Sequence, residues 1–288
     1  MPPADCTSAG AAAEKDSLHK RFGARFSERD WTVGVGTSAL GDVPLVYSMS
    51  GAVEVSLVLP TYNERECLAL LHDRIDAVLS PYRHEVIVVD DHSPDGTGEL
   101  AQQLSESGPY RLVSRPGRAG LSSAVLDGCR VATGDIVAVM DADGSHPPER
   151  LPDLIEPVRA GRAEFTLGSR RVRGGSDEGL AALRWMVSWG ATLPARLLTS
   201  VHDPMSGFFA VRRTVLDRAV LAPTGFKVAL EILVKCRPAP IVEVPFQFGK
   251  RLAGESKLGP TVIASYWRHL LRLYRWRLFE NGAASTTR

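Results

Sequence analysis

The stretch Ile136-Val137-Ala138-Val139-Met140-Asp141-Ala142-Asp143 decides the fold, because it joins a run of apolar residues directly to two carboxylates. A run of this length that is rich in β-branched residues is typical of a strand buried on both faces of a parallel sheet. Asp141 and Asp143 then lie at the carboxyl end of the strand, which is the edge where open parallel sheets bind ligands. Alternate residues of an extended chain point the same way, so the two carboxylates share one side.

Two carboxylates so close together repel each other unless a cation lies between them. A hard divalent ion that also binds a diphosphate fits both, because such ions prefer oxygen ligands. The alternative is a loop whose aspartates cap a helix that begins near Pro148. His146 offers a further metal ligand, although beside Pro147 a structural turn histidine is the commoner case, and His202 has the same two interpretations.

Strands and helices alternate on both sides of this stretch. The apolar runs predict strands at 55–59, 86–89, 111–113, 136–140, 164–167 and 208–211. Helical spacing of apolar residues predicts helices at 68–78, 100–104, 121–132, 151–158 and 228–235. Asn63 and Glu66 resemble a capping box at the start of the first helix. This order predicts a parallel sheet flanked by helices, not a helical bundle.

The composition limits the class of protein. The chain has 288 residues, of which 44% are hydrophobic and 23% charged, which is ordinary globular composition. The formal net charge is +1, so no global field favours nucleic acid. The four cysteines lie far apart and suit free thiols in a reducing cytoplasm. No apolar run reaches the roughly 20 residues that span a bilayer, and no signal peptide is expected.

Familiar phosphate-binding loops are missing from the sequence. No G-x-G-x-x-G follows the first strand and no G-x-x-x-x-G-K-[ST] occurs, which disfavours dinucleotide dehydrogenases and P-loop enzymes. Carboxylates stand near the strand ends instead, at Glu64, Asp91, Asp141 and Asp143. Carboxylates accept hydrogen bonds from a base or a ribose and bind metals. The pattern indicates a nucleotide held by carboxylates and a metal ion.

Short motifs occur along the chain in a definite order. They are VLPTYNE at 58–64, VVDDHSPDGT at 88–97, GLSSA at 120–124, MDAD at 140–143, GSR at 168–170, DPMSGFF at 203–209 and GESK at 254–257. Together, from about Val53 to Arg275, they resemble the dolichol-phosphate (polyprenol-phosphate) mannosyltransferases, which are inverting family 2 glycosyltransferases. The resemblance implies the GT-A fold, an α/β fold with a mostly parallel central sheet flanked by helices.

The resemblance also implies roles for the residues that match the family's motifs. A guanine nucleotide sugar would be held by Pro60, Tyr62, Glu64, Asp91, Asp141, Arg251 and Lys257, the last two from a loop that closes over the donor. A Mg²⁺ or Mn²⁺ ion would be held by Asp141, Asp143 and Ser145. The catalytic residues would be Asp143 and three that receive the acceptor phosphate, Arg170, Arg184 and Ser188. Glu231 is similar to a position that faces the sugar, although a glutamate on a helix surface is the commoner case.

The residues after Asp143 depart from the family pattern. The family commonly reads D-A-D-L-Q-H-P-P-E, in which the Gln side chain binds the metal, whereas Gly144 and Ser145 stand here. A serine offers only a short hydroxyl, so a water would complete the ligand shell. The departure leaves the choice of metal and sugar open. It also motivates an alternative of another class, a weakly active homologue that serves as a binding subunit.

Arginines crowd the segment that follows the strand at 164–167, namely Arg170, Arg171, Arg173, Arg184 and Arg196. A phosphate monoester is already ionised at neutral pH, since its second pKa lies at about 6, so its attack needs no general base. The acceptor anion must still be held in place, and guanidinium groups do this bidentately. The alternative for this cluster is a solvated basic face.

The chain is expected to have four segments. Residues 1–52 are a loosely ordered extension, 53–259 the GT-A catalytic domain, 260–280 an amphipathic helix and 281–288 a tail. One side of the helix carries Ile263, Trp267, Leu270, Leu271 and Tyr274, and arginines lie largely on the others. The apolar stripe either covers the catalytic core or lies in the headgroup region of an anionic membrane.

The sequence therefore predicts an enzyme that transfers mannose from GDP-mannose to a polyprenyl phosphate with inversion, using Mg²⁺ or Mn²⁺. We expect it in the cytoplasm, peripheral at the cytoplasmic face of a membrane, where a membrane-anchored partner subunit could recruit it. No nucleic acid partner is expected. An alternative keeps the fold but uses another nucleotide sugar or a soluble hydroxylated acceptor.

Overall fold

The computed structural model describes residues 31–32, 48–49, 52–118, 120–176, 190, 192–222, 227–249 and 260–280. The chain divides into two compact units, Met1–Ala52 and Val53–Arg288. In the first unit, β1 (Trp31–Thr32) pairs antiparallel with β2 (Ser48–Met49). The remaining residues of the first unit, apart from Ala52, lie outside the described residues, and so does the prediction that they are loosely ordered.

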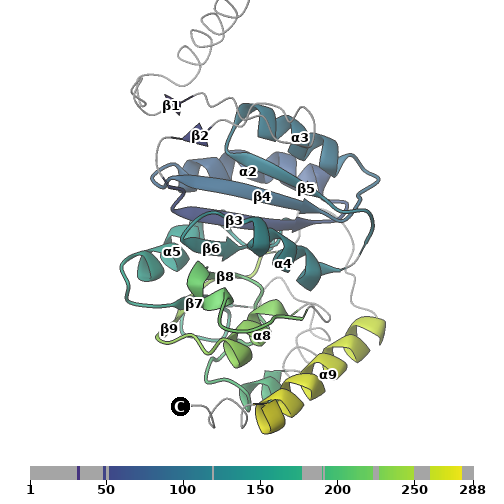
Figure 1. Ribbon diagram of the computed structural model, residues 1–288, viewed down its shortest axis with the longest axis vertical. Helices are drawn as coiled ribbons and strands as arrows, with labels where there is room; N and C mark the ends of the chain where they lie inside the picture. The colour runs from purple at the N-terminus through teal and green to yellow at the C-terminus, as the bar shows by residue number, and fades with distance from the viewer. Residues whose placement is uncertain are drawn as a thin grey trace, which may run out of the picture. The chain divides into compact units, whose positions relative to one another are not determined.

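The described residues of the second unit form a seven-stranded sheet with the order β5-β4-β3-β6-β8-β7-β9 (Figure 1). Its strands are β3 (Val55–Thr61), β4 (His84–Asp90), β5 (Tyr110–Ser114), β6 (Ile136–Val139), β7 (Phe165–Ser169), β8 (Phe209–Arg212) and β9 (Ile241–Pro245). Neighbouring strands run parallel except at β8, which pairs antiparallel with both β6 and β7. The predicted mostly parallel sheet is therefore confirmed.

Helices cover both faces of the sheet because the strands are apolar on both faces. One core cluster joins Leu57 and Leu59 to α2 (Arg65–Leu79), α3 (Thr97–Ser107) and α5 (Leu151–Arg159). The other joins Val58, which points to the opposite side, to α4 (Leu121–Val131) and α8 (Val228–Lys235). Each fully buried aliphatic side chain stabilises the fold by about 1.5–3 kcal/mol. Two short helices complete this part, η1 (Pro148–Arg150) and α7 (Arg213–Leu216).

The start of α2 corrects the predicted capping box. The helix begins at Arg65, and Asn63 lies before it with φ 57°, so Asn63 and Glu66 do not cap it. The backbone amides of Glu64 and Arg65 donate instead to Thr97 Oγ1 and Asp95 Oδ2, each at 3.1 Å. Burial alone would raise the pKa of Asp95, but hydrogen bonds from Thr97 and Arg65 lower it. The cap therefore comes from a segment distant in sequence.

Strand direction brings many chain ends to one edge of the sheet. Because β6 and β7 are both antiparallel to β8, they run parallel to each other. The carboxyl ends of β3, β4, β5, β6, β7 and β9 therefore meet at one edge, together with the start of β8. We call this edge the rim. It carries Tyr62, Asp91, Arg115, Asp141, Arg170 and the 203–208 turn before β8.

The C-terminal helix α9 (Pro260–Arg275) continues into a π-helical turn, η2 (Trp276–Glu280). Its Tyr266, Leu270 and Leu273 are buried with residues of α8 and of the 195–205 segment. Tyr274 Oη donates to Pro194 O at 2.6 Å. One side of the helix therefore covers the core, but of the predicted stripe only Leu270 and Tyr274 belong to that side, whereas Ile263, Trp267 and Leu271 are exposed. Within the described residues, no helix has the length and apolar character needed to cross a bilayer.

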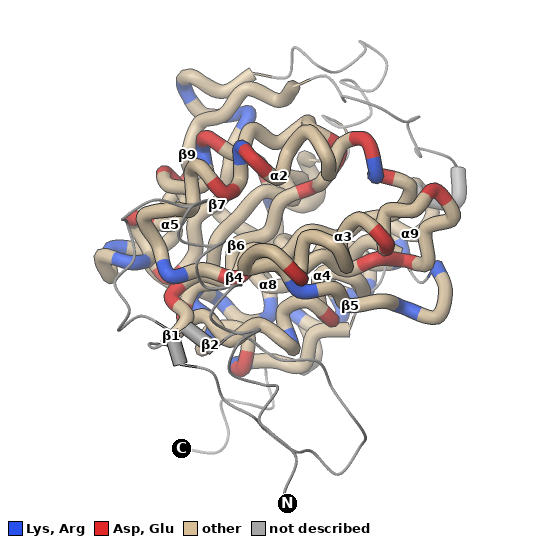
Figure 2. Tube along the Cα trace, turned by 90° about the horizontal axis from the view of Figure 1, so that it is seen from above, with Lys and Arg blue, Asp and Glu red and all other residues tan. Residues whose placement is uncertain are grey.

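Positive and negative residues are interspersed along the described trace (Figure 2). This distribution matches the formal net charge of +1. Attraction to anions must therefore come from local groups of cations rather than from a field of one sign.

Candidate active site

The residues after β6 fold into a tight turn built on Asp143. Its Oδ1 accepts hydrogen bonds from Ser145 N at 3.0 Å and from Ser145 Oγ at 2.5 Å. Gly144 has φ 80°, a left-handed conformation that glycine adopts without steric cost. The 3₁₀ helix η1 has Pro147 at its N-cap and no side-chain cap, so the alternative that the aspartates cap this helix is wrong.

The carboxylates of Asp141 and Asp143 differ in their exposure to solvent. The Asp141 side chain is 31% exposed, whereas Asp143 is 6% exposed. Among the described residues, no three His, Cys, Asp or Glu side chains form a metal cluster. Two carboxylates at an open edge fit Mg²⁺ or Mn²⁺ that takes its other ligands from substrate phosphates and water. Ser145 is fully buried and donates to Asp143, so the structure places it as a support for that carboxylate.

His146 is a structural histidine of this turn. Its Nδ1 accepts a hydrogen bond from Asp141 N at 3.0 Å, and its ring stacks on Phe208 at 4.9 Å between centroids. Burial lowers the pKa of His146 and outweighs the negative charges of Asp141 and Asp143, which act to raise it, so the ring stays neutral. With Nδ1 occupied by a backbone amide, His146 orients the start of the turn.

Arg170, at the end of β7, lies across the rim in a buried ion pair with Asp203. Its Nε and Nη2 donate to Asp203 Oδ2 and Oδ1 at 2.7 and 2.9 Å, and its backbone amide donates to Oδ2 at 3.1 Å. The side chains are 8% and 0% exposed. Burial acts to raise the pKa of Asp203, but hydrogen bonds and the charge of Arg170 lower it. The pair fixes the guanidinium at the rim, and Asp203 takes up two of its N–H donors.

Lys227 is a second cation in this region that the sequence did not single out. Its Nζ donates to Met205 O. Burial and Arg170 lower its pKa to about 8, while Asp203 and Asp141 act to raise it. Lys227 directly precedes the apolar helix α8. A cation next to a segment that must be buried is the sequence signal that could have identified it.

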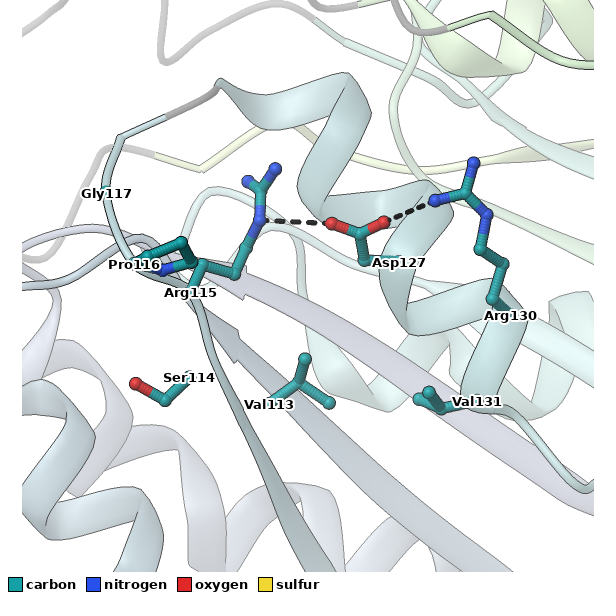
Figure 3. Close-up of a pocket in the computed structure, with 8 residues that line it drawn as sticks. All are labelled: Val113, Ser114, Arg115, Pro116, Gly117, Asp127, Arg130 and Val131. Carbon is teal, nitrogen blue, oxygen red and sulfur yellow. Dashed lines mark hydrogen bonds and ion pairs between the residues drawn. The ribbon is translucent and has the colours of Figure 1, made fainter.

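A second cluster lies on the other side of the rim, around Asp91. Asp91 Oδ1 pairs with Arg115 Nη1, and its Oδ2 accepts from Gly120 N at 3.1 Å. Arg115 Nη2 donates to Ser123 Oγ at 2.8 Å, and its Nε lies 3.1 Å from Asp127 Oδ2. In Figure 3, Arg115 and Arg130 both point at Asp127, beside a groove of about 440 Å³. Sequence reasoning missed Arg115, which holds Asp91 in place.

The end of β3 completes this side of the rim. Asp91 N donates to Thr61 O at 3.0 Å, so the ends of β3 and β4 are joined. Tyr62 is half-buried, and the guanidinium of Arg118 lies 4.3 Å above its ring. Pro60 is buried within β3, and Glu64 stands at the N-cap of α2. A planar ring, a cation and a fixed carboxylate are groups that can bind a nucleobase.

Other sequence predictions have different outcomes. Arg184, Ser188, Arg251 and Lys257 lie outside the described residues. Arg173 and Arg196 are exposed, so the solvated basic face is correct for them. Glu231 is buried, so the commoner case of a glutamate on a helix surface does not hold for it. Its Oε1 accepts from Lys235 Nζ at 2.6 Å and from Ala222 N at 2.9 Å.

His202 contacts Glu243 of β9 rather than Asp141 or Asp143. It is exposed, and its Nδ1 lies 2.6 Å from Glu243 Oε2. The same carboxylate oxygen accepts a hydrogen bond from the backbone amide of His202 at 2.9 Å. These contacts join the start of the 203–208 turn to β9, in agreement with the structural interpretation of this histidine.

An α/β sheet whose rim carries two carboxylates after β6 and the Asp91–Arg115 cluster after β4 and β5 is the architecture expected of a nucleotide-sugar transferase. The family model Glycosyl transferase family 2 matches residues 56–219, and the chain belongs to this family. The predicted GT-A fold and family are thereby confirmed.

Two related proteins have names that are more specific than the family description. The chain is 46% identical over 228 residues to a dolichol-phosphate mannosyltransferase of Pyrococcus furiosus, an alignment that covers 78% of this chain and 64% of that protein. It is 40% identical over 245 residues to the protein of the same name from Saccharomyces cerevisiae, covering 80% and 91%. The chain thus spans less than two thirds of the Pyrococcus relative but most of the yeast one.

A solved structure shares the fold. The glucosyl-3-phosphoglycerate synthase of Mycobacterium tuberculosis, in complex with Mn²⁺ and UDP-glucose, matches with a TM-score of 0.55 and 25% identity. The match covers 78% of this chain and 79% of that one. A structural neighbour with this fold therefore binds a divalent metal together with a nucleotide sugar.

Proposed function

We propose that this chain transfers mannose from GDP-mannose to a polyprenyl phosphate, with inversion at the anomeric carbon and with Mg²⁺ or Mn²⁺. The observation that carries the proposal is the pair Asp141 and Asp143 at the end of β6. Two relatives of this chain, 46% and 40% identical to it, are named dolichol-phosphate mannosyltransferases, which supports the choice of sugar and acceptor.

The residues around the pair have complementary tasks in this reaction. Asp141 and Asp143 would hold the metal ion, which neutralises charge on the departing nucleoside diphosphate when bound. The Ser145 hydroxyl and amide keep Asp143 oriented. Gly144 allows this turn because its φ of 80° costs a glycine no steric strain. This support argues against the alternative of a weakly active homologue that serves as a binding subunit.

The acceptor side needs cations rather than a base. A phosphate monoester attacks as an anion, and Arg170, which Asp203 holds at the rim, is proposed to receive it. Arg184 and Ser188 are proposed to complete this site. A buried, preorganised guanidinium binds an anion more strongly than a solvated one, because less reorganisation is needed.

The nucleotide side is proposed to recognise guanine. Asp91 accepts hydrogen bonds, and guanine presents N–H donors on one edge. Arg115 and the Gly120 amide orient both carboxylate oxygens before any ligand binds. Pro60, Tyr62 and Glu64 lie beside Asp91 at the end of β3, and Arg251 and Lys257 are proposed to close over the donor.

A direct assay tests the proposed function. Purified protein is incubated with a panel of nucleotide sugars and either a short polyprenyl phosphate or a soluble hydroxylated acceptor. We expect transfer from GDP-mannose to the lipid phosphate, loss of transfer on chelation of divalent metal, and a product of inverted anomeric configuration by NMR. Transfer only to a soluble alcohol would favour the alternative acceptor class. No turnover of any donor would favour the binding subunit.

A lipid acceptor requires the enzyme at a membrane surface. The outer side of α9 and η2 exposes Trp267 and Leu271 by 47% and 63%, and Leu278 and Phe279 by 71% and 73%. Arginines such as Arg268 and Arg272 are exposed beside them. Aromatic and aliphatic side chains flanked by arginine are typical of helices that lie in the interface of anionic membranes. We propose peripheral binding at the cytoplasmic face, aided or not by a membrane-anchored subunit.

Membrane binding can be tested without removing the helix. The double variant Trp267→Ser and Leu271→Ser is expected to bind anionic vesicles about tenfold more weakly, because both exposed side chains lose apolar contact with lipid. Flotation with phosphatidylglycerol vesicles measures the bound fraction. Leu70→Ser on α2 is the matched control, since Leu70 is exposed by 61%. Equal flotation of the double variant and the wild type would contradict the proposal.

A further inference from the structure

The 203–208 turn before β8 connects the two halves of the proposed site. Its first residue, Asp203, holds Arg170 through both carboxylate oxygens. Near its end, a Cβ placed on Gly207 would lie 3.8 Å from Asp141 Oδ1, so the turn reaches the metal-side carboxylate as well. The turn therefore lies beside both Arg170 and Asp141.

The turn has few internal hydrogen bonds that could define its shape. Ser206 N donates to Asp203 O at 3.1 Å, and Phe208 N donates to Ser206 Oγ at 3.2 Å. The residue in the middle, Met205, is 7% exposed and offers its carbonyl to Lys227 Nζ. A charge-assisted hydrogen bond to a backbone carbonyl in a poorly solvated place is stronger than a neutral one.

Lys227 lies where it can act on the turn and on its charged neighbours together. The positive charge is repelled by Arg170, and Asp203 and Asp141 interact favourably with it. Burial of an ammonium group is costly unless hydrogen bonds and opposite charges offset it. The backbone carbonyl of Lys227 accepts a hydrogen bond from Glu231 N at 3.3 Å, which holds the lysine at the start of α8.

We propose that Lys227 is a positioning residue that anchors the 203–208 turn through Met205 O and thereby places Arg170 for the acceptor phosphate. The proposal rests on the proposed function for its catalytic consequence. The anchoring itself does not depend on which substrate the enzyme uses. Lys227 acts through the turn and is not required to touch a substrate.

Two measurements on Lys227→Met test the proposal separately. Amide hydrogen exchange of the 203–208 turn reports the anchor without any substrate, and we expect at least tenfold faster exchange at Ser206 and Phe208. Steady-state kinetics report the consequence. We expect the KM for polyprenyl phosphate to rise about tenfold while the KM for GDP-mannose changes less than about twofold. Lys227→Arg, which keeps a cationic donor, should recover most of both effects.

The matched control is Arg212→Met at the opposite end of β8. Arg212 Nη2 also donates to a backbone carbonyl, Val158 O, at 3.0 Å, but away from the rim. It should lower stability without changing either KM or the exchange of the turn. If Lys227→Met does not fold, Lys227→Leu, which also lacks a donor, has the same expected outcome.

Unchanged exchange in a folded Lys227 variant would overturn the anchor. An equal rise of both KM values, or the same kinetic change in Arg212→Met, would overturn the positioning role. An inactive wild type would instead refute the proposed function, and the exchange measurement would still decide whether Lys227 holds the turn.

Discussion

Asp143→Ala is expected to reduce mannosyl transfer by about 10³-fold or more while leaving the protein folded. The change removes one of two carboxylates proposed to hold the divalent ion, and groups that stabilise the charge of a leaving group typically contribute effects of this size. Asp143 also organises the turn after β6 through Ser145, but those bonds lie in a short loop outside the strands. Circular dichroism and thermal melting should therefore change little.

The control for this variant is Asp153→Ala on α5. Asp153 is 49% exposed and pairs with Arg150 across one helical turn, an interaction of little value at the surface. Its removal should leave transfer and melting temperature nearly unchanged. Binding of Mn²⁺ with GDP, measured by calorimetry, should weaken in Asp143→Ala and not in Asp153→Ala. Full transfer activity in Asp143→Ala would refute the metal assignment.

Asp203→Ala is expected to cost both stability and activity. It leaves the buried guanidinium of Arg170 without its carboxylate partner, and breaking a buried ion pair in this way typically costs about 3–5 kcal/mol. Transfer should fall below a few per cent of wild type, because Arg170 is no longer fixed at the rim. Urea unfolding measures the first effect, and initial rates with polyprenyl phosphate measure the second.

The comparison pair for Asp203→Ala lies at the surface. Arg150→Ala removes the partner of Asp153, with both side chains 49% exposed, and should cost no more than about 1 kcal/mol. A similar loss in both variants would contradict the role of the buried pair.

The stability difference between wild type and Asp203→Ala should also depend on pH. The folded pKa of Asp203 lies below its ordinary value of 3.8, so the ionised carboxylate stabilises the folded state. This contribution is complete above the ordinary pKa and is lost as the pH falls through the lower folded value. The two unfolding curves should therefore converge only in strong acid, which unfolding measured from pH 7 downwards can check.

Local patterns in the sequence predicted those parts of the fold that depend on local physics. The helix expected at 228–235 is observed as Val228–Lys235, because a continuous apolar segment must be buried. The strand before Asp141 is buried on both faces, as its β-branched residues indicated. The place of Asp91 and Asp141 at the rim followed from the predicted strands, because each residue comes just after the end of one of them.

Features formed between distant segments could not be read from the sequence. The direction of β8 is not encoded in its apolar period, which is the same for parallel and antiparallel strands. The cap of α2 comes from Asp95 and Thr97 rather than from Asn63. The side chains of these two residues, about 30 positions further along the chain, accept the hydrogen bonds of the first amides of the helix. Arg115 and Lys227 look like ordinary surface cations in the sequence, and only the packing of other segments buries their contacts.

The reversed direction of β8 makes the far edge of the sheet accessible to engineering. The chain enters β8 at the rim and leaves it beside α7, where Arg213 contacts Gly134 O and Asp135 O rather than any carboxylate of the rim. Val220, shortly after α7, is 86% exposed. A fluorescent label on the Val220 side chain would extend into solvent, whereas a peptide inserted here would disturb the hydrogen bond from Lys235 Nζ to Val220 O.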